Sequence, residues 1–445
     1  MVLKMTVKMV VEHIPYCIGK WIAKIPFSWR LGRTYITTKQ KCVRFECATE
    51  EAKGAYALEH FAKVFERAKD FECYRKLYED AGVLDLKIRT MDDIRKVPTI
   101  DKAWTRKHFG EFKGAYRLNT GGSSGEPTAF WMDKGCWARE WAHMHTIWEK
   151  LEYKYTDLKL AIRGKNLGAR PFAYNPVHNE YIINTYLSVK DYAAELKKLF
   201  EKRRPKWFHG YPSSIYQFIL ECEAAFGKDG VHELFKCVTG LLLSSEYPHP
   251  YLVKKFEEYG LKWISWYGHS EMAVLAWADD AMVYHPFVTY GLSEVVGAGE
   301  GLTTNCTNYT KKEEVEHGRH LIGTSYHNFD MPLVRYDTGD LVEAVEGGFK
   351  IKEGRNGDFI EDRNGKKIPL TALIFGRHHK AFDVAEHVQI RQTSSGKATL
   401  IVTMKRDGDI RMSDMFDLSN VDVDFDMEIV DKPIRTPAGK LRLKV

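Results

Sequence analysis

The sequence predicts an α/β fold in which a large domain is followed by a small α+β domain. Between about residues 159 and 268, short apolar segments that end in polar loops alternate with amphipathic helices. After Asp358 the pattern changes to alternating strands. A chain of 445 residues is long enough for two or three domains. We therefore expect a mainly parallel sheet covered by helices on both faces, followed by a smaller sheet.

The first hundred residues are expected to be helical. Apolar residues recur about every 3.6 positions in Ala52–Phe71 and Glu72–Ala81. Pro98 to Asp101 predicts the capped start of another helix. Parallel sheets bind ligands beyond the carboxyl ends of their strands, so polar residues after each strand are candidate site residues. Further helices are expected over 136–151 and 191–202, and strands over 159–163, 206–210, 241–246, 263–268, 399–403 and 421–429.

Composition indicates an ordinary globular protein, with 44% hydrophobic and 28% charged residues. A net charge of +6 without a dense basic block does not indicate a nucleic-acid partner. The eight cysteines include no C-x-x-C pair, which is typical of a reduced, cytoplasmic protein. No signal peptide and no membrane-spanning apolar stretch are expected.

The segment from Met1 to Arg33 interleaves apolar residues with lysines and arginines. Such a basic amphipathic segment either lies on an anionic membrane surface, here the inner face of the membrane, or packs on the protein body with its lysine stems outward. We favour packing, because most amphipathic helices face a protein core.

Five polar motifs follow one another along the chain. The first is rich in glycine and hydroxyl groups, which lets backbone N–H groups wrap phosphates. It is not a Walker loop, since no G-x-x-x-x-G-K-[ST] occurs, and no G-x-G-x-x-G follows a strand. The motifs are Thr120-Gly-Gly-Ser-Ser-Gly-Glu-Pro-Thr128, Tyr267-Gly-His-Ser-Glu271, Arg335-Tyr-Asp-Thr-Gly-Asp340, Gly354-Arg-Asn-Gly-Asp358 and Thr436-Pro-Ala-Gly-Lys440.

In this order the motifs resemble the adenylate-forming superfamily of acyl-CoA synthetases, adenylation domains and luciferases. The chain is most similar to the phenylacetate–CoA ligase branch and its relatives in capsular polysaccharide biosynthesis. Pro127-Thr128, His209–Ser214 and Ser244–Tyr247 mark the branch. The resemblance implies an N-terminal domain over 1–357, helical up to residue 100, that binds ATP and the acid. It also implies a mobile C-terminal lid over 358–445 with its hinge at Asp358.

The resemblance implies ATP and Mg²⁺ as ligands and assigns each motif a role. Glu271 would hold Mg²⁺, Ser270 would lie beside the α-phosphate, and Lys440 on the lid would neutralise the reacting centre. A surface glutamate and a solvated terminal lysine are the alternatives, and the motif order favours the catalytic roles. The implied ATP-binding residues are Thr120, Gly121, Gly122, Ser123, Ser124 and Gly125 for the phosphates, Ser245, Glu246, Tyr267 and Gly268 for adenine, and Asp340 and Arg355 for ribose and phosphate.

The acyl pocket is implied to contain histidines that could hold an anionic or hydroxylated acid, such as a sugar acid or an amino acid. Satisfied core histidines are the alternative. The residues are His209, Tyr211, Trp266, His269 and His285.

The acceptor of the acyl group is left open between coenzyme A and an amine. Gly357 and Glu361 depart from the family pattern of two acids followed by a lysine, and Glu361 favours the amine. Two further readings remain: a nucleotidyltransferase resembling the enzyme that adenylylates the deazaflavin coenzyme, and a catalytically silent scaffold of a polysaccharide assembly complex.

Overall fold

The computed structural model describes the chain from residue 14 to its end with some gaps. The residues outside the description are 1–13, 120–127, 166, 186, 245, 298–299, 304–318, 354–358, 366, 375–378, 405–414, 420 and 436–441. In the described part, no helix is both long and apolar enough to cross a bilayer.

The chain divides into two compact units, and each is assembled from separate stretches of sequence. The first unit contains the described residues of Met1–Ile25, Lys154–Trp263 and Asp358–Val445. The second contains those of Pro26–Tyr153 and Ile264–Gly357. That residues 358–445 move as a lid stays a prediction.

The first unit contains the parallel strands that the sequence predicts. Strands β3, β5, β6 and β7 pair in parallel in the order β7-β6-β3-β5, and β4 joins the edge in antiparallel orientation. Gly210 ends β6 against β3, where an added Cβ would lie 1.9 Å from the Ile162 carbonyl oxygen. Only glycine allows this approach. The bounds are β3 (Lys159–Lys165), β4 (Phe172–Asn175), β5 (Glu180–Asn184), β6 (Trp207–Gly210) and β7 (Gly240–Leu243).

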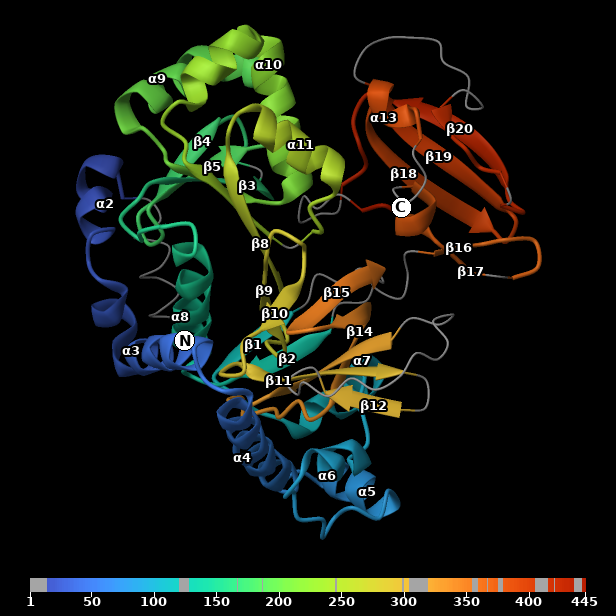
Figure 1. Cartoon of the computed structure of the whole chain (residues 1–445). Helices are drawn as coiled ribbons and strands as arrows, with labels where there is room; N and C mark the ends of the chain where they lie inside the picture. Colours follow the sequence, from blue (N-terminus) through green and yellow to red (C-terminus); the bar gives the residue numbers. More distant parts are fainter. Residues whose placement is uncertain are drawn as a thin grey trace. The chain divides into compact units, whose positions relative to one another are not determined.

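Helices of the first unit pack on these strands, as Figure 1 shows in green for α9, α10 and α11. Their apolar faces share one core with the strands, including Phe208, Ile219 and Leu241, each fully buried. The helices are α2 (Tyr16–Ile22), α9 (Ala193–Arg203), α10 (Pro212–Phe235) and α11 (Pro250–Glu258), with the 3-10 turn η2 (Val189–Tyr192).

The C-terminal part of the first unit has its own small sheet and core. Strand β18 (Ala385–Ser394) pairs in antiparallel orientation with β19 (Lys397–Met404), and β20 (Asp424–Val430) pairs in parallel with β19. Ile390, Leu400 and Val402 lie at the centre of the core. The expected small α+β part is therefore confirmed. Its other elements are β16 (Phe359–Glu361), β17 (Lys367–Pro369), α12 (Leu370–Ile374) and α13 (Ala381–Val384).

The second unit differs from the expected parallel arrangement, because its strands pair in antiparallel orientation. Their order is β12-β11-β13-β14-β15-β10-β9-β8. Short connections explain the difference, since strands joined by a tight turn must run in opposite directions. The bounds are β8 (Lys262–Gly268), β9 (Leu275–Ala278), β10 (Tyr284–Pro286), β11 (Gly291–Gly297), β12 (Glu300–Thr303), β13 (Arg319–Ser325), β14 (Tyr336–Val345) and β15 (Gly348–Glu353).

Helices form the N-terminal part of the second unit, as the sequence predicts. Thr49, Thr90 and Asp101 cap α4, α6 and α7 through their side chains. Phe61, Tyr74 and the strand residue Tyr336 share one buried core. The elements are α3 (Phe27–Glu46), α4 (Glu50–Ala68), α5 (Glu72–Asp80), α6 (Met91–Lys96), α7 (Lys102–His108), η1 (Phe109–Glu111), β1 (Tyr116–Asn119), β2 (Ala129–Met132) and α8 (Cys136–Glu149).

A buried histidine joins α8 to the loop before β11. His143 Nδ1 lies 2.8 Å from the Arg139 carbonyl oxygen, and its Nε2 lies 2.9 Å from Thr289 Oγ1. Burial lowers the pKa of His143 to about 3, and the Arg139 carbonyl only partly offsets this effect. The imidazole is therefore neutral in the folded protein at neutral pH.

We expect His143 to make the protein acid-sensitive. The unfolded chain binds a proton at this position near pH 6.5 and the folded chain only near pH 3, so stability falls as pH drops between these values. At pH 5 the loss from this histidine is about 2 kcal/mol. Urea unfolding at pH 7.5 and pH 5 checks it: His143→Gln should reduce the stability lost between these pH values by about 2 kcal/mol. An unchanged loss would contradict the assignment.

Candidate active site

The second and third motifs meet around the Glu271 carboxylate. The side chain follows the end of β8 and is 3% exposed. Its Oε2 lies 3.1 Å from His269 Nδ1, and its Oε1 accepts a hydrogen bond of 3.2 Å from the Tyr336 hydroxyl. Lys102 Nζ lies 3.8 Å from the same Oε1. One buried carboxylate thus has a histidine, a phenol and a cation around it.

Glu271 remains ionised in these surroundings. Burial alone would raise its pKa, but the charge and hydrogen bond of His269, together with Lys102, outweigh burial and lower the pKa to about 2. An ionised carboxylate is the hard oxygen ligand that Mg²⁺ takes in proteins, usually with phosphate oxygens of the substrate. The residues present therefore fit a Mg²⁺ site at Glu271.

The contact with the carboxylate also places a proton on Nδ1 of His269. Because ionised Glu271 can only accept, His269 must carry a proton on Nδ1. The side chain is 5% exposed, and its Nε2 has no hydrogen-bond partner in the described part of the chain. A buried ring nitrogen with no hydrogen-bond partner among the described residues thus lies beside the candidate metal ligand.

A second contact joins the same motifs. The Tyr267 hydroxyl donates a hydrogen bond of 2.6 Å to Asp340 Oδ2, and both side chains are at most 9% exposed. Gly339 has a φ of 76°, and its N–H donates to Asp337 Oδ1 at 2.8 Å. This turn directs Asp340 toward Tyr267, and only glycine adopts that φ without strain. The predicted adenine and ribose residues are therefore direct neighbours.

Lys102 is a site residue that the sequence motifs did not indicate. A backbone bridge places it: Ile100 N–H donates to the Arg335 carbonyl at 3.1 Å, and Asp337 N–H donates to the Ile100 carbonyl at 2.7 Å. Lys102 then begins α7, which Asp101 caps. The cap was recognisable in the sequence, but its pairing with the third motif was not.

A buried ion pair holds the start of the third motif. Arg335 contacts Glu294 through two nitrogens, at 3.1 Å from Nε and 3.0 Å from Nη2, and the two side chains are 5% and 0% exposed. Its Nη1 also donates to the Arg95 and Val97 carbonyls, at 3.0 and 2.5 Å. These contacts fix the residue that precedes Tyr336.

Two non-glycine residues beside the site have left-handed backbone conformations. Met272 has a φ of 54° and follows Glu271 directly, and Arg335 has a φ of 48° and precedes Tyr336. Such conformations cost about 1–3 kcal/mol each and persist only where surrounding contacts impose them. Strand β11 constrains the backbone next to Met272. It approaches so closely that a Cβ on Gly291 would lie 2.5 Å from the carbonyl oxygen of Ala273, the residue after Met272.

The other predicted residues of the second unit have different surroundings. Ser270 is exposed at the turn that carries Glu271. Trp266 is buried, with its ring 5.9 Å from that of Trp148. His285 has both ring nitrogens engaged, at 2.9 Å from Asp279 Oδ2 and 3.1 Å from the Gly347 carbonyl. The structure does not link His285 to Glu271.

Three predicted residues gather in the first unit where β6 leads into α10. His209 is buried on β6, and burial followed by the nearby Arg163 and Lys159 charges holds its pKa well below the usual range. Tyr211 is the residue before α10. Glu246 Oε2 accepts a hydrogen bond of 3.3 Å from Ser213 N–H in the first turn of α10. The predictions for Thr120–Gly125, Ser245, Arg355, Asp358 and Lys440 fall outside the described residues.

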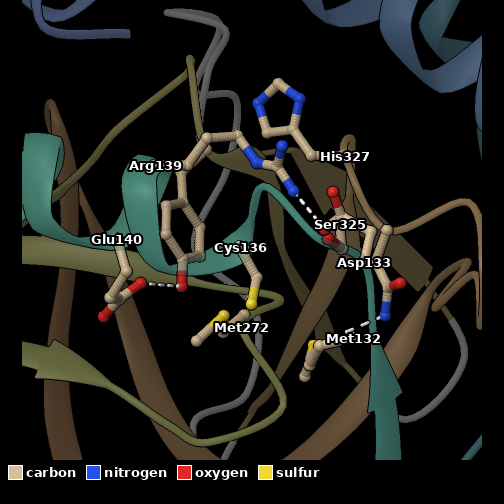
Figure 2. A pocket seen from close by; sticks show the side chains of 10 residues that line it. Met132, Asp133, Cys136, Arg139, Glu140, Met272, Ser325 and His327 are labelled. Atoms are coloured by element: carbon tan, nitrogen blue, oxygen red, sulfur yellow. Dashed lines mark hydrogen bonds and ion pairs between the residues drawn. The ribbon is translucent and has the colours of Figure 1, made fainter. Parts of the chain in front are cut away.

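A small pocket lies behind the Glu271 turn, between α8 and the strands. Figure 2 shows Glu140, Cys136 and Met272 around it, and the Tyr290 hydroxyl donates a hydrogen bond of 2.7 Å to Glu140. Burial raises the pKa of Glu140, which Tyr290 and His269 partly offset. The cavity volume is ≈ 20 Å³, enough for one water molecule and too small for an acyl substrate.

Known proteins resemble the chain in fold and, at low identity, in sequence. No protein-family model matches the chain. In sequence it is 23% identical over 394 residues to Protein CapK of Staphylococcus aureus, covering 82% of this chain and 80% of CapK.

In structure it is similar to 2-hydroxyisobutyryl-CoA ligase in the postadenylation state, with a TM-score of 0.62 and 15% identity over 87% of this chain and 88% of that one. The same ligase with acyl-AMP and CoA in the thioesterification state gives a TM-score of 0.53 and 16% identity over 90% of each chain. The chain therefore has the fold of this acyl-CoA ligase and is distantly similar in sequence to CapK.

Proposed function

We propose that the protein is an ATP-dependent carboxylate ligase. It activates a carboxylic acid as acyl-AMP with release of pyrophosphate, and then transfers the acyl group to coenzyme A or to an amine. The observation that carries the proposal is the meeting of two motifs at Glu271, where Tyr336 and His269 contact the carboxylate. Tyr267 and Asp340, the predicted adenine and ribose residues, are in contact in the same unit.

In this proposal some residues neutralise charge and others align the reactants. Both reactants are anions, so the reaction needs positive charge and fixed geometry. Mg²⁺ would be held by Glu271 and would supply charge neutralisation on the phosphates. Lys440 would place its ammonium at the reacting centre, and the Thr120–Gly125 loop would bind the phosphates. Lys102, whose Nζ lies 3.8 Å from Glu271 Oε1, would add a cation beside that carboxylate.

The acid is proposed to carry a polar group near its carboxyl group that hydrogen-bonds to His269. The support is the buried Nε2 of His269, which has no hydrogen-bond partner among the described residues and lies next to Glu271. A buried polar group of this kind discriminates strongly in favour of a substrate that completes its hydrogen bond. A hydroxy acid, a sugar acid or an amino acid fits this requirement, and phenylacetate does not.

We expect His269→Asn to raise the KM for the acid by about tenfold to a hundredfold. Asparagine can still donate to Glu271 from the position of Nδ1, but it lacks Nε2, so the KM for ATP should stay within about twofold of wild type. His285→Asn is the matched variant, because His285 was predicted for the same pocket and has both nitrogens engaged. Equal effects of the two substitutions on the acid KM would contradict this role of His269.

The acceptor is proposed to be an amine or coenzyme A, in the synthesis of a surface or capsular polysaccharide. The name of CapK, which is similar in sequence to this chain, supports a role in capsule synthesis. Glu361, which replaces the lysine of the family pattern, accepts a hydrogen bond of 2.7 Å from Ser395 within the C-terminal part. A carboxylate at this position favours an amine over the anionic coenzyme A.

The experiment that tests the function is acid-dependent exchange of pyrophosphate into ATP, over a panel of hydroxy acids, sugar acids, amino acids and aryl acids. Exchange with one class establishes adenylation and identifies the acid. Adding coenzyme A or amines then shows which acceptor releases AMP. Transfer of AMP to a substrate without its release would instead indicate a nucleotidyltransferase. No exchange in protein that ATP does not stabilise against heating would indicate a scaffold.

A further inference from the structure

One face of helix α3 packs on α8. Figure 1 draws α3 meeting α8 at the lower end of α8. The Tyr35 hydroxyl lies 2.8 Å from His145 Nδ1, and Lys39 Nζ donates to Thr146 at 3.0 Å and to Glu149 at 2.5 Å. The polar groups of this inner face therefore have their partners on α8.

Helix α3 also carries exposed apolar side chains and cations, on either side of a break at Gly32, whose φ of 69° is not helical. Trp29 before the break and Ile36 and Val43 after it are 79%, 40% and 59% exposed. Ile36 and Val43 are seven residues apart, about two helical turns, and so lie on one face. Arg33, Lys41 and Arg44 are exposed on the same helix, and within the described residues none of these three forms an ion pair.

Helix α2, which precedes it in the sequence, has the same character on its own. Trp21 and Ile18 are 62% and 58% exposed. Lys24 and Lys20 hold their ammonium groups 4.6 and 5.4 Å from the centre of the Trp21 ring. From Tyr16 to Glu46 the chain has seven lysines or arginines and one acid. The whole chain has a net charge of +6, so this segment alone accounts for the excess.

We propose that helix α3 binds the surface of an anionic lipid bilayer. Tryptophan prefers the interface between headgroups and acyl chains, isolated aliphatic side chains insert just below it, and lysines and arginines bind the anionic headgroups. A protein partner fits less well, because protein interfaces have a contiguous apolar centre depleted in lysine. Here single apolar residues are separated by cations. The proposal does not depend on the adenylation chemistry.

The test is flotation of the full-length protein with vesicles of equal parts phosphatidylglycerol and phosphatidylcholine, beside vesicles of phosphatidylcholine alone. The anionic vesicles should bind the protein at least tenfold more strongly, and salt at about 1 M should remove the difference. The variant Arg33→Gln/Lys41→Gln/Arg44→Gln should lose at least tenfold in partition, since each charge contributes about fivefold. Trp29→Ala/Ile36→Ser/Val43→Ser should lose a similar factor on anionic vesicles at any salt concentration.

The matched control is Lys63→Gln/Lys87→Gln/Lys96→Gln, which removes three lysines of the same unit whose side chains are 56%, 69% and 57% exposed. It should bind vesicles like wild type. Equal binding to both kinds of vesicle, or an equal loss in the control, would overturn the proposal. Sedimentation provides a further check. If wild type self-associates without binding vesicles and the Trp29 variant is monomeric, the exposed face binds a second copy of the chain and the proposal is wrong.

Discussion

Glu271→Gln is expected to lower the rate of acid-dependent ATP–pyrophosphate exchange by about 10²–10³-fold. The change keeps the size of the side chain but removes the charge that the surroundings hold ionised, with a pKa of about 2. Glutamine is a poor ligand for Mg²⁺. Besides the lower rate, the variant should need a much higher Mg²⁺ concentration for half-maximal exchange, and titration with Mg²⁺ at fixed ATP measures this.

Two further variants distinguish a metal-binding role of Glu271 from a general loss of activity. Tyr336→Phe removes only the hydrogen bond of 3.2 Å to Oε1 and should lower the rate by about fivefold. Lys440→Ala should lower the rate as severely as Glu271→Gln without changing the Mg²⁺ requirement of the remaining activity. If Glu271→Gln keeps wild-type exchange and Mg²⁺ dependence, Glu271 is not the metal ligand.

Arg335→Met is expected to lower the free energy of unfolding by about 3–5 kcal/mol. The substitution leaves Glu294 buried without its cation. In the wild type, burial raises the pKa of Glu294, and Arg335 partly offsets this effect. It also removes the donor to the Arg95 and Val97 carbonyls. Urea unfolding at pH 7.5 measures the loss.

The double variant Arg335→Met/Glu294→Met checks the cause. With no charge left in the site, it should recover a large part of the lost stability, because an apolar pair replaces a buried ion pair at little cost. Arg363→Met removes an exposed arginine that pairs with Asp422 and should leave stability essentially unchanged. A loss of the same size in the single and double variants would show that the carbonyl contacts, not the ion pair, hold Arg335.

The sequence by itself determined the elements with strong local signals. Apolar runs that end in polar loops identified β3, β6, β7 and β8, and side-chain caps identified the start of α7 at Asp101. The order of the motifs also predicted site roles for Glu271, Tyr267 and Asp340, and their motifs contact one another in the folded unit. These predictions depend on short windows of sequence, and local propensity and burial operate at that range.

The tertiary structure decided what depends on pairing between distant segments. The strands of the second unit are antiparallel, which the period of a single strand cannot show. Lys102 reaches Glu271 only because Ile100 pairs with Arg335 and Asp337, more than two hundred positions along the chain. The unsatisfied Nε2 of His269 and the cationic outer face of α3 likewise follow from which neighbours each side chain has after folding. Residue spacing does not predict those neighbours, because long-range contacts form between segments whose local sequence patterns are unrelated.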